Sequence, residues 1–332
     1  MERHVLKMNY VVLDLEWNQG VDKKKREKKK KVPNFEIIEI GAVRLNKNRE
    51  KESEFSRLIK PQIYAKLHHL AKNLLHMKME ELQSGKPFVE VMADFLRWCG
   101  EDFIFCTWGP LDLSELQSNM RYYGMETLKS APLRFLDVQK LFSLAYDDGK
   151  SRCSLEAAVD FLAIEKDIPF HRAFSDAYYA GKVLARIPER FYENYSYDVF
   201  NPPRTKEDEI HVVFEGYAKS IFRVFPDKQA ALEDKGVVAT KCYVCRKSLK
   251  KTIRWFTPNG KNFYCVAYCD VHGFMKGKLR IRKAEGQGVY VVKTTKLITP
   301  QQVEEIRLKQ EHARMLHRKK RASESGGHTE DL

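Results

Sequence analysis

The sequence predicts an α/β domain, with a mixed sheet flanked by helices, followed by a small metal-binding domain. Strand-like apolar runs alternate with helix-like runs through the first 190 residues. Four of the seven cysteines lie between Cys242 and Cys269. Residues 235–300 hold 15 basic and 2 acidic side chains, whereas residues 1–200 hold 32 and 30. Most of the net charge of +14 therefore belongs to the second domain.

The first domain is expected to open with a meander of three strands and to continue with alternating strands and helices. The strands are placed at 10–15, 35–45, 54–59, 103–107 and 133–138, and the helices near 88–98, 111–123, 154–164 and 173–186. The predicted boundaries are a first domain at 1–189, a helical connector at 190–235, a basic ribbon at 236–298, and a C-terminal helix with a disordered tail at 299–332. The connector helix is expected near Glu207, and the last helix is expected to end near Arg321.

The composition narrows the classes of protein to consider. With 43% apolar and 31% charged residues over 332 positions, the chain is typical of globular proteins and unlike disordered, collagen-like or coiled-coil sequences. No apolar run is long enough to span a bilayer, and residues 1–10 do not read as a secretory signal, so we expect a cytoplasmic protein without a membrane partner. The positive charge favours a nucleic-acid partner.

Acidic residues stand where ligands usually bind in α/β sheets. Asp14 and Glu16 end a strand that is apolar on both faces, two residues apart and therefore on one face of the sheet. Asp112 follows a second apolar strand at the start of a helix, where it could also act as a cap. His171 and Asp176 open a helix with a narrow face of small residues, which allows close approach to the sheet. The three segments are expected to converge.

The chain resembles the DEDDh 3'-5' exonucleases of the RNase H-like (DnaQ-like) superfamily over residues 8–188. The resemblance rests on Asp14-Leu15-Glu16, on Trp108-Gly109-Pro110-Leu111-Asp112, and on His171-Arg172-Ala173-Phe174-Ser175-Asp176. The segment Phe35-Glu36-Ile37-Ile38-Glu39-Ile40-Gly41-Ala42-Val43 is most similar to the Eri and KapD exoribonuclease branch. The resemblance implies an RNase H-like mixed sheet and a 3'-5' exonuclease, with RNA favoured over DNA.

Four converging carboxylates repel one another unless divalent cations lie between them. Oxygen ligands suit Mg²⁺ or Mn²⁺, and a pair of such ions supports phosphodiester hydrolysis. By resemblance, Asp14, Glu16 and Asp176 bind the first ion, Asp14 and Asp112 hold the second, and His171 takes the proton from the attacking water.

Side chains beside these motifs are expected to contact the nucleic acid. Trp17, Asn18 and Trp108 flank the acids and could stack on or hydrogen-bond a terminal nucleotide, although core packing is an equal alternative for the tryptophans. The run 23–31 contains eight basic residues and one Glu, and its Lys28 and Lys30 are candidate phosphate contacts, with a solvated loop as the alternative.

The cysteines of the second domain have the spacing of a zinc ribbon. Cys242 and Cys245 form one C-x2-C pair, and Cys269 and His272 follow with a C-x2-H-G pattern, so we predict one structural Zn²⁺ on these residues. Cys265 competes for a place in the ligand set, and the preferred interpretation turns it toward the core. Four buried cysteines without a metal are the alternative.

The same domain is expected to grip a single-stranded partner through basic side chains interleaved with aromatic ones. The residues selected for this role are Arg254, Trp255, Lys276, Lys278, Arg280 and Arg282. Together the patterns predict a two-metal 3'-5' exonuclease acting on single-stranded nucleic acid. A DNA-directed exonuclease of the proofreading or repair type is the first alternative, and a non-catalytic nucleic-acid-binding adaptor is the second.

Overall fold

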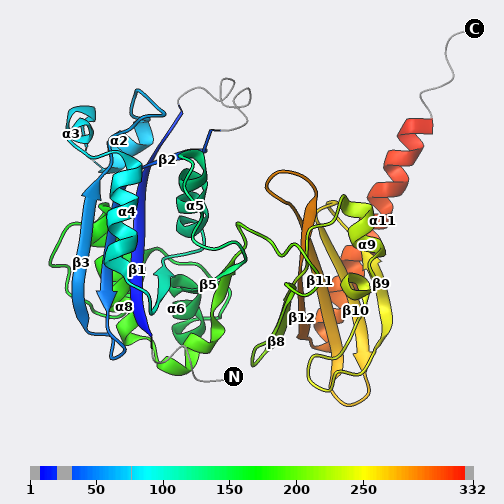
Figure 1. Ribbon diagram of the computed structural model, residues 1–332. Helices are drawn as coiled ribbons and strands as arrows, with labels where there is room; N and C mark the ends of the chain where they lie inside the picture. The colour runs from blue at the N-terminus through cyan, green and yellow to red at the C-terminus, as the bar shows by residue number, and fades with distance from the viewer. Residues whose placement is uncertain (1–7, 21–31, 76, 326–332) are drawn as a thin grey trace, which may run out of the picture. The chain divides into compact units, whose positions relative to one another are not determined.

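The computed structural model describes residues 8–20, 32–75 and 77–325, and its chain forms two compact units, Met1–Phe200 and Asn201–Leu332 (Figure 1). The first unit contains a six-stranded sheet in the order β3-β2-β1-β4-β5-β6. Its strands are β1 (Asn9–Gln19), β2 (Phe35–Leu45), β3 (Lys51–Leu58), β4 (Phe103–Thr107), β5 (Leu133–Asp137) and β6 (Ser196–Asp198). β2 pairs antiparallel with β1 and with β3, β4 pairs parallel with β1 and with β5, and β6 pairs antiparallel with β5. The predicted mixed α/β fold is confirmed.

Helices cover both faces of this sheet. The helices are α2 (His69–Leu75), α3 (Met79–Gln83), α4 (Phe88–Cys99), α5 (Asp112–Tyr122), α6 (Val138–Tyr146), α7 (Leu155–Phe161), α8 (Ala173–Arg186) and the 3-10 helix η2 (Glu189–Asn194). One apolar core joins the sheet to α4 and α5, and a second joins the opposite face to α6, α7 and α8. The sequence patterns did not predict α2, α3, α6 or β6.

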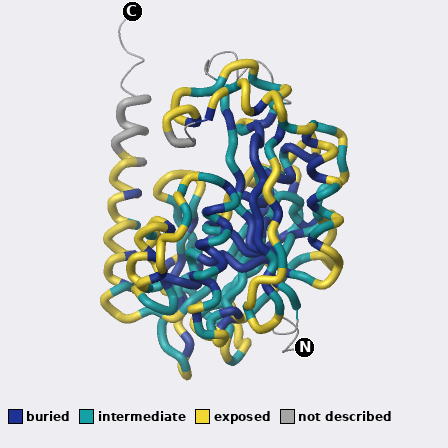
Figure 2. The backbone as a smooth tube through the Cα atoms, turned by 90° about the vertical axis from the view of Figure 1, so that its left-hand side faces the viewer, coloured by how far each residue is buried: buried dark blue, intermediate teal, exposed yellow. Residues whose placement is uncertain are grey.

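β1 is a central strand of the sheet, and its side chains pack into both apolar cores. Val11 and Leu13 pack toward α4 and α5, while Tyr10 and Val12 pack toward α8. All four are essentially inaccessible to solvent, which explains why this strand is apolar on both faces. Figure 2 shows the buried positions following the strands at the centre of the sheet.

The second unit is built on a separate antiparallel sheet in the order β7-β8-β12-β11-β10-β9. Its strands are β7 (Ile210–Val213), β8 (Tyr217–Ile221), β9 (Lys250–Phe256), β10 (Asn262–Cys269), β11 (Gly273–Lys283) and β12 (Val289–Leu297). One face packs with α9 (Lys228–Glu233) and α10 (Lys235–Val238) through Phe222, Phe263, Leu279 and Val291. On the other face, Val303 and Ile306 of α11 (Pro300–Ser325) pack on Ile253 and Val266.

Two expectations about this unit differ from the structure. The segment 190–235 is not a helical connector, because it supplies η2, β6, β7, β8 and α9, and the neighbourhood of Glu207 is a turn. Residues 210–221 pair with one another and with β12, so they belong to the second sheet. α11 continues past Arg321 to Ser325, and the rest of the expected tail lies outside the described residues.

Among the helices described, we find none that is both long and apolar enough to cross a bilayer.

Candidate functional site

β1 presents Asp14 and Glu16 on the side of the sheet that faces α8. Successive side chains of a strand alternate between faces, so these acids continue the face of Tyr10 and Val12. In β2, Gly41 lies opposite Asp14 and Glu39 lies opposite Glu16. The acids therefore stand at the edge of the core beneath α8.

Gly41 allows the first turn of α8 to reach these acids. A Cβ atom at this position would lie 2.0 Å from both the Ala173 carbonyl carbon and the Phe174 nitrogen, so no side chain fits there. Asp176 lies in the first turn of α8. The close approach of helix and strand thus places Asp176 beside Asp14.

The three carboxylates form one group. Asp14, Glu16 and Asp176 each offer an oxygen, and these oxygens all lie within 4.8 Å of one another. Burial raises the pKa of Asp14 well above its ordinary value, and the charges of Asp112, Glu16 and Asp176 raise it further. Burial and the same kind of repulsion raise the pKa of Glu16 to about 8. A cluster that resists ionisation in this way is suited to a divalent cation, which would relieve the repulsion.

Asp112 is not part of the group of three, but its charge acts on Asp14 more strongly than that of any other residue. It is the first residue of α5 and does not cap the helix, because the N-cap position is Leu111. Burial raises the pKa of Asp112 to about 7, and hydrogen bonds from its own backbone N–H and that of Leu15 oppose the rise. The carboxylate is thereby fixed beside Leu15, which lies between Asp14 and Glu16 in β1.

His171 precedes α8 in a left-handed backbone conformation, with φ of 69°. Its backbone N–H donates to Oδ1 of Asp176 over 3.3 Å, which ties the residue to the acidic group. Burial raises the pKa of Asp176, and this donor works against the rise. The residue itself is exposed, so its imidazole is accessible from solvent.

An ion pair between a half-exposed arginine and a buried glutamate, which the motifs did not predict, supports the same turn. Arg172 donates from Nε and Nη2 to the two carboxylate oxygens of Glu39 over 2.9 and 3.0 Å. The Glu39 side chain is 2% exposed. Glu39 and Gly41, both in β2, thus position the start of α8. Glu39 forms a bidentate ion pair with Arg172, and Gly41 leaves room for the helix backbone. Glu39 lies inside an apolar segment of the sequence. An acidic residue in such a segment indicates a buried carboxylate that needs a partner, and this signal could have predicted the ion pair.

The expected nucleotide contacts of the first unit have different surroundings. Asn18 is fully buried, and its amide donates to the Lys66 carbonyl and accepts from the His68 N–H, so it anchors a loop. Trp17 packs against Phe35 with ring centroids 5.2 Å apart. Trp108 packs on the core beside α6, and its buried Nε1 has no hydrogen-bond partner. These placements favour the packing alternative. Lys28 and Lys30 lie outside the described residues.

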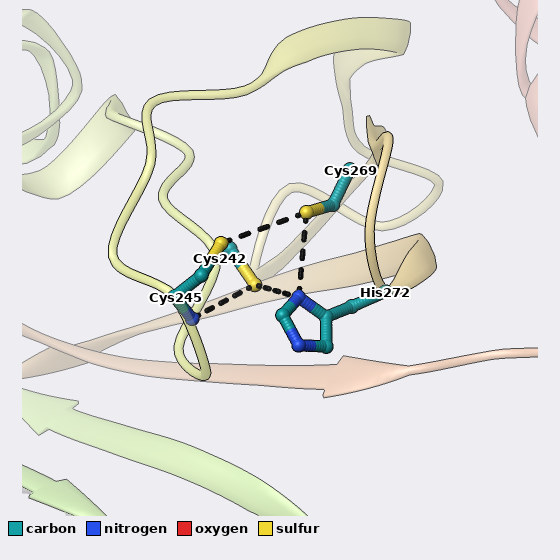
Figure 3. A group of neighbouring side chains, drawn as sticks. All are labelled: Cys242, Cys245, Cys269 and His272. Atoms are coloured by element: carbon teal, nitrogen blue, oxygen red, sulfur yellow. Dashed lines mark hydrogen bonds between the residues drawn. The ribbon is translucent and has the colours of Figure 1, made fainter.

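The second unit brings together the four predicted sulfur and nitrogen ligands (Figure 3). Cys242 and Cys245 come from the loop between Lys241 and Ser248, which are joined by a β-bridge, and Cys269 and His272 come from the β10–β11 turn. Their ligand atoms all lie within 4.8 Å of one another.

The spacing of these atoms fits a tetrahedral metal. Cys245 Sγ lies 3.7 Å from Cys269 Sγ, and His272 Nδ1 lies 3.6 Å from the sulfurs of Cys242 and Cys269. A tetrahedron with Zn–S bonds of about 2.3 Å has edges of about 3.8 Å. Contact with His272 lowers the pKa of Cys269 to about 6, which favours the thiolate that a metal requires.

Cys265 points elsewhere. It is fully buried, and a Cβ atom on Gly277 would lie 2.7 Å from its sulfur and equally close to Trp255. Burial raises the pKa of Cys265 to about 12, so it remains a neutral thiol in the core. The geometry supports the preferred set of Cys242, Cys245, Cys269 and His272.

The expected basic surface of the second unit is only partly on the surface. Trp255 is partly buried and packs against the core under α9 and α10, and its Nε1 donates to the Val238 carbonyl over 2.9 Å. This packing gives Trp255 a structural role, and its contact with nucleic acid stays a prediction. Arg254, Arg280 and Arg282 are exposed, and Lys276 and Lys278 are partly exposed.

Comparison with known proteins decides the family. The family described as "Exonuclease" (RNase T) matches residues 11–184, about half of the chain and all the acidic motifs. The chain belongs to this exonuclease family. No curated protein matches its sequence.

Several solved structures are similar to this exonuclease. One, described as 3'-end specific recognition of histone mRNA stem-loop by 3'-exonuclease, is 18% identical with a TM-score of 0.46, and the match covers 54% of this chain and 81% of that one. The nuclease domain of 3'hExo, a DEDDh family member bound to rAMP, is 17% identical with a TM-score of 0.46, covering 54% and 91%. E. coli Exonuclease I in complex with a dA16 oligonucleotide is 10% identical with a TM-score of 0.45, covering 78% and 55%.

Proposed function

We propose that this exonuclease is a two-metal-ion 3'-5' enzyme that removes nucleotides from the 3' end of single-stranded nucleic acid, RNA in preference to DNA. The observation that carries the proposal is the carboxylate group, with oxygens of Asp14, Glu16 and Asp176 within 4.8 Å and the charge of Asp112 acting on Asp14. An oxygen-only donor set fits Mg²⁺ or Mn²⁺. The preference for RNA follows the likeness of residues 35–43 to the Eri and KapD branch.

The residues of the chain have separate tasks in this proposal. Asp14, Glu16, Asp112 and Asp176 would hold the cations, which when bound activate water and neutralise charge on the departing oxygen. His171 would accept a proton from the attacking water, and its exposed position beside Asp176 supports that task. The bond between phosphorus and the 3' oxygen breaks, which releases a nucleoside 5'-monophosphate and leaves a new 3' hydroxyl.

The proposal extends to the second unit and to the cell compartment. Cys242, Cys245, Cys269 and His272 would hold one structural Zn²⁺, because their spacing matches the edges of a zinc tetrahedron. Thiols that ligate a metal must stay reduced, which supports a cytoplasmic location. The basic side chains of this unit would bind the strand that the first unit trims.

The proposal is tested with matched RNA and DNA oligonucleotides labelled at the 5' end and incubated with the full chain and Mg²⁺. We expect a ladder of products from RNA that shorten one nucleotide at a time, and no shortening of RNA blocked by a 3'-phosphate. Equal trimming of DNA would support the DNA-directed alternative. Intact RNA and DNA would contradict the proposal and support a non-catalytic adaptor.

A further inference from the structure

One face of the second sheet carries a row of basic side chains from β11. Leu279 and Ile281 pack with the core under α9 and α10. Because side chains alternate along a strand, Lys276, Lys278 and Arg280 project to the opposite face. This is the face on which α11 lies, since Val303 and Ile306 of that helix pack on Val266.

Tyr264 lies in the middle of this row. It is paired with Lys278 across the β10–β11 ladder and is partly exposed. The Nζ atoms of Lys276 and Lys278 lie 5.3 and 5.6 Å from the centre of its ring. The row thus combines an aromatic ring with flanking cations.

The cations of this face repel one another. Lys296 of β12 lies opposite Lys276, and Lys309 of α11 adds its charge to both lysines of the row. Among the ion pairs of the described residues, none includes Lys276, Lys278, Lys296 or Lys309. Burial, followed by the neighbouring positive charges, lowers the pKa values of Lys276 and Lys278. A polyanion on this face would relieve that repulsion.

We propose that this face, here called the Tyr264 face and defined by Tyr264, Lys276, Lys278, Arg280 and Lys296, binds single-stranded RNA with a base stacked on Tyr264 and phosphates on the lysines. A duplex keeps its bases paired and unavailable, whereas a single strand offers both a π-face and a charged backbone. The choice of RNA as the occupant rests on the proposed function. The binding itself rests on the geometry of the sheet.

The test measures fluorescence anisotropy of a labelled 12-nucleotide adenosine RNA with the full chain, in buffer without added divalent metal. Tyr264→Leu should weaken binding about 5- to 150-fold, the effect of about 1 to 3 kcal/mol for one stacked base. Tyr264→Phe, which keeps the ring, should retain the affinity. Lys276→Ala combined with Lys278→Ala should reduce the log-log salt slope by about 1.4, at about 0.7 per phosphate contact on a single strand.

Lys228→Ala is the matched control. Lys228 Nζ lies 5.1 Å from the ring centre of Phe263, an equivalent contact on the other face of the sheet. It should leave affinity and salt slope unchanged, and the thermal unfolding of each variant shows whether it is folded. Equal losses for Lys228→Ala and for the lysine pair, or unchanged affinity of Tyr264→Leu, would overturn the inference.

Further outcomes separate this inference from the proposed function. Matched DNA that binds equally tightly, with the same loss in Tyr264→Leu, would overturn the choice of RNA. Binding to anionic phosphatidylserine vesicles through the lysine pair, without binding to RNA, would overturn the inference in favour of a lipid surface. A chain that binds RNA through this face but never shortens it would contradict the proposed function and support the face.

Discussion

The two candidate metal centres of this chain are assembled in opposite ways. The acidic centre draws its residues from β1, α5 and the start of α8, across the span from Asp14 to Asp176. The Cys and His centre uses two turns, and its residues lie between Cys242 and His272. The first centre depends on the whole sheet, whereas the second depends on local turns. Their sensitivity to remote changes should differ accordingly.

The electrostatic states of the two centres also differ. Burial raises the pKa values of Asp14, Glu16 and Asp112, and repulsion from neighbouring acids adds to each rise, so this centre favours protonated acids until cations enter. In the other centre, contact with His272 lowers the pKa of Cys269 to about 6. The acidic centre without cations therefore disfavours ionised carboxylates, whereas the Cys and His centre contains Cys269, which favours the ionised thiolate.

The largest expected effect is on activity. Asp14→Asn and Asp176→Asn should each reduce nucleotide release by about 100- to 1,000-fold, the usual loss when one oriented electrostatic contact to the transition state is removed. The measurement is the initial rate of nucleotide release at saturating Mg²⁺. Glu165→Gln, at an exposed acid outside the site, is the control and should match the wild type. Wild-type rates in both aspartate variants would remove the acidic centre from the mechanism.

The next effect separates the two centres by stability. Cys245→Ser should abolish stoichiometric zinc and destabilise the second unit while the first keeps its unfolding transition, since structural zinc supplies about 10 to 16 kcal/mol in finger peptides. Zinc content from native mass spectrometry and thermal unfolding test this. Cys265→Ala is the control, because Cys265 lies in the core and should leave the zinc bound. Zinc retained by Cys245→Ser and lost by Cys265→Ala would reverse the ligand assignment.

A smaller effect tests how far the acidic centre depends on its supports. Glu39→Gln weakens the ion pair to Arg172 and should lower kcat about 10- to 100-fold with little change in KM, which is typical of residues that orient metal ligands. Steady-state kinetics separate the two constants. Arg97→Lys, at an exposed pair with Asp94, is the matched control. A rise in KM alone would place Glu39 in substrate binding instead.

The smallest effect concerns pH. The pKa of Glu16 is raised to about 8 and that of Asp112 to about 7, so the folded state binds protons that the unfolded state releases above about pH 4.5. In the metal-free first unit these two acids should therefore favour the folded state fully below about pH 4, and this contribution should be lost as pH rises through 7 and 8. Urea unfolding at several pH values checks this, and added Mg²⁺ should diminish the loss. Stability that rises over this window would show that the acids are not coupled as described.

The sequence was most informative where the chemistry is local. The C-x2-C and C-x2-H-G patterns identified all four side chains that now lie within 4.8 Å, because turns fix their spacing. Asp14 and Glu16 could be placed on one face from strand alternation alone. Glu39 escaped notice because its partner Arg172 is 133 residues away.

Other errors have physical causes as well. Simple alternation does not give the side of the sheet on which Trp255 lies, because register shifts interrupt the β9–β10 ladder. The short strands β7 and β8 were missed because β7 pairs only with β8, and the other partner of β8, β12, lies far along the chain. Pairings of this kind leave little trace in local composition.

The pairing of β8 with β12 also constrains how the protein forms during synthesis. Every strand of the first sheet has been translated once Asp198 is made, so that sheet can close early. The opening hairpin of the second sheet, β7 and β8, must wait until the ribosome has released β12, which ends at Leu297. Until then one edge of that hairpin is an open template, and the nascent chain is most exposed to mispairing in this interval.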